Sequence, residues 1–163
     1  MTLMGQARRQ PEELIAASQH LLYEFWMLNS LGRGMASAVL GQGPLNNAVL
    51  ESFAIHARVM LGFLYEGKRY PDDVVAGDYF DDPNDWVKVR PSIPEALIPV
   101  QKRANKEVAH LSYKRLGIAD EARLWRFIDI AAAIGSIMAV FLRHVPAERL
   151  HPDWLPLPEP ESP

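Results

Sequence analysis

The sequence predicts an all-α protein, a four-helix bundle with a long irregular segment between its second and third long helices. Four segments repeat their apolar residues at helical spacing, and no stretch alternates apolar and polar residues over the length of a strand. A chain of 163 residues favours one domain, large enough to bury a core. We expect this domain to span residues 1–145, and the Pro-rich residues 146–163 to form an extended or disordered tail.

The first two helices are predicted from apolar stripes and from the residues at their ends. Pro11 suits the first turn of a helix, and the pattern that follows ends in the stretch 29–34, which contains two glycines. The second helix should run over residues 45–66, because its apolar side chains recur every three or four positions. Gly67 follows directly, where a glycine commonly ends a helix.

The segment 67–93 breaks the helical pattern with six Asp, three Pro and two Gly. A short helical turn is expected near residues 73–79, and the rest should be irregular. Its Asp residues lack the ordered spacing of a calcium loop, so a solvated acidic loop is the preferred interpretation. Its aromatic residues suggest that the segment packs onto the domain; they are Tyr70, Tyr79, Phe80 and Trp86.

The last two helices are predicted over residues 100–116 and from Asp120 to the residue before Pro146. Ser92, followed three positions later by Glu95, resembles a capping box ahead of the first of them. The final helix is rich in small residues over 131–139, which allow helices to approach closely. Two interpretations stay open for it: a central helix packed within one chain, or a helix shared across a dimer interface.

Composition excludes several functions. The chain has no cysteine, so disulfides, thiolate zinc sites and a cysteine nucleophile are excluded. The net charge of −3 gives no overall attraction to nucleic acid. The longest uncharged apolar run, residues 130–142, is shorter than the roughly 20 residues of a membrane span. We therefore expect a cytoplasmic protein that does not enter a membrane.

Arg103 and His110 are the strongest candidates for chemistry. On a continuous helix they lie about 20° apart around the axis and roughly 10.5 Å apart along it, on the most polar face. Histidine acts as an acid or base near neutral pH, and arginine holds phosphate with paired hydrogen bonds. A metal-independent phosphodiester site would use these two residues, whereas a solvated helix face would show the same pattern.

His56 lies on the apolar stripe of the second helix. A core histidine with one structural hydrogen bond is the simpler interpretation, and a cleft shared with the helix of His110 is the alternative.

Glu107 and His110 have the spacing of metal ligands in carboxylate-bridged di-iron bundles. The second such pair, Glu148 and His151, lies between two prolines rather than on a core helix. We therefore expect no metal and no cofactor.

The stretch RANKEVAH, residues 103–110, on the penultimate long helix of a bundle resembles the HEPN superfamily. The stretches LESFAIHAR, DDVVAGDYF and ANKEVAHLSYKR also resemble a group of uncharacterised bacterial proteins. The superfamily often has a polar residue directly after the arginine, whereas this chain has Ala104 there and Asn105 one position later.

The HEPN resemblance implies a homodimer that cleaves RNA without metal at its interface, with Arg103 and His110 as the catalytic pair. Asn105, Lys106 and Glu107 would support or bind the RNA, Tyr113 could stack on a base, and a toxin or defence role with an antitoxin-like partner would follow. The alternative is a non-catalytic helical module that binds a nucleotide, RNA or a partner protein.

Overall fold

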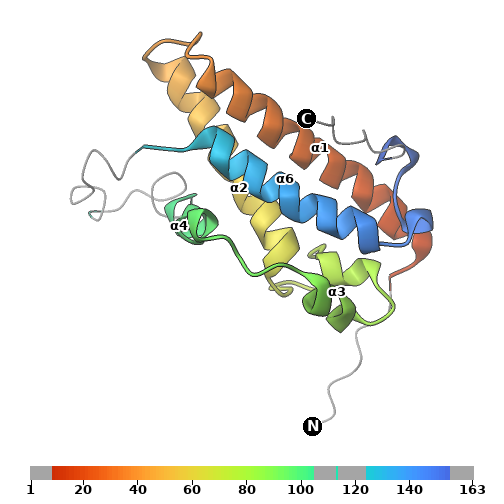
Figure 1. The fold of residues 1–163 in the computed structure, drawn as a ribbon. Helices are drawn as coiled ribbons and strands as arrows, with labels where there is room; N and C mark the ends of the chain where they lie inside the picture. Colours follow the sequence, from red (N-terminus) through yellow and green to blue (C-terminus); the bar gives the residue numbers. More distant parts are fainter. Residues whose placement is uncertain (1–8, 105–112, 114–123, 155–163) are drawn as a thin grey trace, which may run out of the picture.

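The computed structural model describes residues 9–104, 113 and 124–154, and over these residues all of its regular structure is helical. The predicted all-α class is therefore confirmed. Three long helices contact one another and run side by side in Figure 1. The helices are α1 (Pro11–Ala36), α2 (Pro44–Tyr65), α3 (Pro83–Val89), α4 (Ile98–Arg103) and α6 (Phe127–His144), with the 3-10 turns η1 (Ala76–Tyr79), η2 (Glu95–Leu97), η5 (Ala147–Arg149) and η6 (Pro152–Trp154).

The core lies where α1, α2 and α6 meet. Leu28, Phe53 and Ile134, one from each of these helices, are fully buried. Near the C-terminal end of α6, Phe141 is also fully buried and is surrounded by aromatic rings. The rings of Phe63, Tyr79, Phe80 and Trp86 all meet it edge-on, with centroid distances of 5.2 to 6.0 Å.

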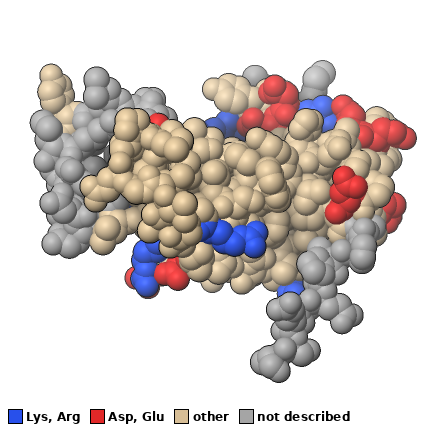
Figure 2. All heavy atoms as spheres, turned by 90° about the horizontal axis from the view of Figure 1, so that it is seen from above, with Lys and Arg blue, Asp and Glu red and all other residues tan. Residues whose placement is uncertain are grey.

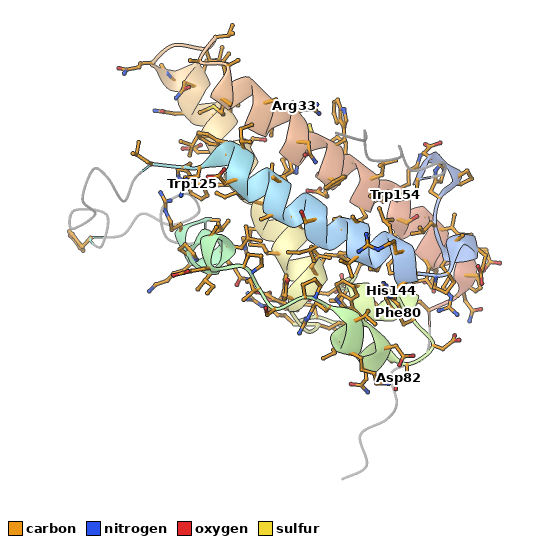
Figure 3. All side chains as sticks on the ribbon, viewed as in Figure 1. Arg33, Phe80, Asp82, Trp125, His144 and Trp154 are labelled. Atoms are coloured by element: carbon orange, nitrogen blue, oxygen red, sulfur yellow. The ribbon has the colours of Figure 1, made fainter. Side chains whose placement is uncertain are left out.

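The segment 67–93 is more ordered than its composition predicts. It contains η1 close to the expected turn, and then α3, which we did not expect. Helix α3 begins because Asp82 accepts a hydrogen bond from the backbone nitrogen of Asn84 at 2.9 Å, with Pro83 in the first turn. Figure 3 shows Phe80 and Asp82 beside α3.

Burial of the aromatic side chains holds this segment down. Tyr79, Phe80 and Trp86 are buried, as predicted, whereas Tyr70 is 67% exposed. The Tyr79 hydroxyl donates to the carbonyl of Leu14 at 3.0 Å, and the Trp86 indole donates to the carbonyl of Leu64 at 2.8 Å. Burial raises the pKa of Tyr79, so its phenol stays protonated and remains a donor.

Several predicted helix ends were wrong. Helix α1 continues through Gly32 to Ala36, because the missing side chain of Gly32 makes room for α2 and α6: a Cβ there would lie 3.1 Å from Phe53 Cε2 and 3.6 Å from Ala131 Cβ. Ser92 forms no capping box, since η2 begins after Pro94 without a side-chain cap. Helix α6 begins at Phe127 rather than near residue 120.

The first half of the expected tail is packed onto the domain. Residues 146–154 contain η5 and η6, and Trp154 is only 4% exposed. Its indole donates to the carbonyl of Ser18 at 2.8 Å, and the backbone nitrogen of His151 donates to the Ser18 hydroxyl at 2.6 Å. The expectation of an extended or disordered segment is wrong here, because these contacts with α1 are invisible in composition; residues 155–163 lie outside the described part of the chain.

Helices α2 and α6 are each long and apolar enough to cross a membrane by length and composition. Their most apolar 18-residue windows are 44% and 33% buried inside the protein, respectively. Both helices also supply core side chains, such as Phe53 and Ile134. When a helix supplies side chains to the core, its length and composition are weak evidence that it crosses a membrane.

Substituting alanine at two helical glycines should change stability in opposite directions. At Gly62 of α2 an added Cβ meets nothing closer than Glu66 Oε2 at 4.0 Å, so Gly62→Ala should stabilise by about 0.5–1 kcal/mol through helix propensity. At Gly32 the added Cβ lies 3.1 Å from fully buried Phe53, and overpacking should cost about 1–3 kcal/mol. Urea denaturation measures both changes; a Gly32→Ala variant more stable than the wild type would contradict the tight packing.

Candidate functional site

Arg103 lies at the end of α4 and is held by its own chain. Its Nη1 donates to the carbonyl of Leu124 at 3.0 Å, and its guanidinium carbon lies 4.3 Å from the centroid of the Trp125 ring. Trp125 is buried against Phe53, with ring centroids 6.4 Å apart. Figure 3 shows Trp125 at the start of α6, so Arg103 connects the end of α4 to the beginning of α6.

The other residues of the predicted catalytic helix are not placed with Arg103. His110, Asn105, Lys106 and Glu107 lie outside the described residues. The pairing of Arg103 with His110 therefore stays a prediction. Tyr113 is described and is 91% exposed, so its ring is accessible from solvent.

His56 pairs with a carboxylate that sequence reasoning did not connect to it. Its Nδ1 lies 2.6 Å from Oε2 of Glu24 on α1, and its side chain is only 11% exposed. An ionised carboxylate can only accept, so Nδ1 carries the proton of this hydrogen bond. Tyr23 lies edge-on to the imidazole at 6.0 Å. This contact fits the interpretation of His56 as a core histidine with one structural hydrogen bond.

The described residues contain no group of three metal-ligand side chains close enough to hold an ion. The Glu24 carboxylate is paired with His56. Glu148 lies in η5 at the surface, and His151 faces Asp153 at 3.3 Å.

A groove that sequence reasoning missed lies between the second half of α2, the segment 66–75 and α4. Its cavity has a volume of about 410 Å³. Arg58 lines it from α2 and Gln101 lines it from α4. The remaining lining residues belong to α2 and the segment that follows it: Val59, Gly62, Phe63, Glu66, Gly67, Arg69, Tyr70, Asp73, Val74 and Val75.

The charged side chains that line this groove differ in the partners that they have. Arg69 pairs with Glu66 at 3.0 Å. Asp73 accepts hydrogen bonds from the backbone nitrogens of Tyr70 and Arg69, and these bonds lower the pKa of its carboxyl. Arg58 is exposed and makes no ion pair or hydrogen bond with any described residue. It is the charged group of this groove that remains available to a ligand.

Exposed apolar side chains gather on neighbouring parts of α1 and α2. Tyr23 and Trp26 are 51% and 59% exposed and lie 6.3 Å apart, while Ile55 and Val59 lie one turn apart on α2 and are 51% and 42% exposed. We call these four residues the α1/α2 face. In Figure 2 much of the middle of the visible surface is uncharged, a basic group lies just below it, and acidic side chains lie along the upper edge and at the end where α1 begins.

No protein-family model matches the chain, and neither a curated protein nor a solved structure matches it.

Removing the acceptor of His56 should destabilise the fold. Glu24→Leu leaves the buried Nδ1 proton without a partner, which should cost about 1–3 kcal/mol of unfolding free energy. Glu24→Gln keeps an acceptor oxygen and should cost less. The matched control is Glu51→Gln on the exposed side of α2, expected within roughly 0.5 kcal/mol of the wild type. Equal stability of Glu24→Leu and the wild type in urea would contradict a structural role for the pair.

Proposed function

We propose that this protein is a non-catalytic helical interaction module that pairs with a second copy of itself through the α1/α2 face. The observation that carries the proposal is the exposure of Tyr23, Trp26, Ile55 and Val59 on two helices that pack together. Tyrosine and tryptophan are enriched at the centres of protein interfaces, where they contribute most of the binding energy.

A second copy suits this face because of its charge. In a two-fold interface each patch meets the same patch of the partner, so a charged face would repel itself. Two ionisable side chains beside the α1/α2 face, Glu24 and His56, are already hydrogen-bonded to each other. Glu51 and Arg58, each one turn from Ile55 on α2, are exposed and of opposite charge, so the face has no excess of one sign. It can therefore be buried against its copy without separating Glu24 from His56.

The small-residue face of α6, which the sequence suggested as the dimer contact, supports the proposal less well. Its larger side chains point inward, with Ile134, Met138 and Phe141 buried. The side chains it leaves exposed include Ala132, Ser136 and Ala139, which offer little apolar area.

We also propose that the third long helix of the predicted four-helix bundle continues from α4.

Charge introduced into the α1/α2 face should abolish self-association. The wild type should sediment as a dimer at tens of micromolar, and Trp26→Glu combined with Ile55→Glu should sediment as a monomer, since burying two carboxylates without partners is costly. The control is Val87→Glu, which adds one carboxylate at an apolar residue of α3 that is 55% exposed. A wild-type monomer at this concentration, or a double variant that stays dimeric, would rule out this interface.

Metal-independent RNA cleavage of the HEPN type is the second candidate, favoured by the Arg103 guanidinium stacked on Trp125 and by the exposed ring of Tyr113. In this proposal a 2′-hydroxyl attacks the adjacent phosphorus and the bond to the 5′-oxygen breaks. His110 would transfer the proton, and Arg103 would stabilise the charge on the phosphoryl oxygens. A cytoplasmic toxin with an antitoxin-like partner belongs to this candidate.

If the RNA proposal is right, purified protein should cleave single-stranded RNA in EDTA. His110→Ala and Arg103→Ala should each lower the rate by roughly 10²- to 10⁴-fold. Because Arg103 also connects α4 to Leu124 and Trp125, its variant must first be shown to fold by circular dichroism and thermal melting. Cleavage that persists in both folded variants would assign the activity to a contaminant and leave the interaction module as the function.

A further inference from the structure

We propose that the groove beside α2 binds a small aromatic monocarboxylate, with the Arg58 guanidinium holding the carboxylate. This site shares Val59 with the α1/α2 face but differs from it in its charged anchor, and Arg103 is not among its lining residues. The proposal rests on the volume of the cavity, on Gly62 in its wall, whose missing side chain the fold does not require, and on the Arg58 guanidinium, which has no partner among the described residues.

The size of the cavity fits a ligand of this class. Pockets that take small organic molecules have volumes of about 300 to 1,000 Å³, and this one has about 410 Å³. Three parts of the chain contribute to it: α2, the segment 66–75 and Gln101 of α4. Because the segment 66–75 leads directly to η1 and its buried Tyr79, the wall of the groove is continuous with the core.

Gly62 leaves the groove open without serving the fold. It lies inside α2, where glycine costs about 1 kcal/mol relative to alanine. Its backbone does not have the positive φ that favours glycine, which is found only at Gly41 and Gly43 among the described glycines. Unlike Gly32, it allows no close approach of another described helix, since outside the backbone of α2 the nearest described atom to its Cβ position is Glu66 Oε2 at 4.0 Å. A side chain at position 62 would instead occupy the cavity.

The pairing of the charged side chains favours a ligand with a single negative charge. Arg69 pairs with Glu66, and the Asp73 carboxylate, which keeps its charge, accepts from two backbone nitrogens. The formal charges of the four side chains cancel, but Arg58 makes no ion pair or hydrogen bond with any described residue, and a guanidinium binds a carboxylate with two parallel hydrogen bonds. A polyphosphate would bring several negative charges close to Glu66 and Asp73, so a monoanion fits better.

The apolar walls select a flat body for the rest of the ligand. Val59 on α2 and Val74 on the segment that follows it both line the groove and are more than 40% exposed. Tyr70, which is 67% exposed, adds an aromatic ring to the lining. The Gln101 amide can donate to or accept from a polar atom on the ring.

The test uses indole-3-acetate as the probe and amide chemical shifts of the isotope-labelled full chain as the measurement. Titration up to roughly 10 mM, which detects millimolar binding, should move the amides of residues 58–75 in the wild type. Arg58→Gln should weaken binding by roughly 10- to 100-fold, the range for losing a hydrogen bond to a charged group. Arg143→Gln, at an exposed arginine of α6, is the matched control and should bind like the wild type.

Two further arms separate charge from shape. Gly62→Leu should fill the cavity and abolish binding while the fold, checked by thermal melting, is kept. Neutral indole and AMP should both bind at least roughly 10-fold more weakly than indole-3-acetate, because one lacks the anion and the other carries more charge. The proposal is overturned if indole-3-acetate moves no amide in 58–75, if Arg58→Gln binds it as well as the wild type does, or if AMP binds more tightly.

Discussion

The fully buried ring of Phe141 is the contact on which the rest of this structure depends. Four rings meet it edge-on, and they come from α2, from η1, from the residue after η1 and from α3. Each such pair adds about 0.5–1.5 kcal/mol beyond the burial of its area. Through Tyr79 and Trp86, which also donate to carbonyls of α1 and α2, the cluster fixes an acidic segment in which most of the other apolar side chains are exposed. The groove beside α2 has a defined wall because of this anchor.

Sequence alone predicts those parts of the fold that are set by local chemistry. Pro11 and Pro44 each stand at the first position of a long helix, and α2 follows its apolar period to within a residue or two of the expected ends. Contacts between distant residues overrode local preference elsewhere. Gly32 reads as a helix end in sequence, yet it is buried where α1, α2 and α6 come closest. Trp154 lies in a proline-rich stretch, but its hydrogen-bond partner is Ser18, which is 136 positions away.

For the candidate sites, too, the sequence reveals local features and misses contacts between distant residues. A motif search finds residues that share one helix, such as Arg103 and His110, and it carries no information on what else holds them. The contacts of Arg103 with Leu124 and Trp125 come from another part of the chain, as does the carboxylate of Glu24 at His56. The groove was invisible because three separate segments build it. Its one local signal was Gly62, a glycine in the middle of a strongly apolar helical pattern.

Features that cost stability without supporting the fold are the best guide to what this protein binds. The aromatic residues around Phe141 and the pair of Glu24 with His56 are explained by folding, because their removal leaves cavities or unpaired polar atoms. The exposed rings of Tyr23 and Trp26, the empty space at Gly62 and the Arg58 guanidinium, which has no partner in the described part of the chain, have no such explanation. Filling the space at Gly62, pairing Arg58 or covering the exposed rings would cost the fold little stability. Leaving these places open keeps surface available for a partner or a ligand.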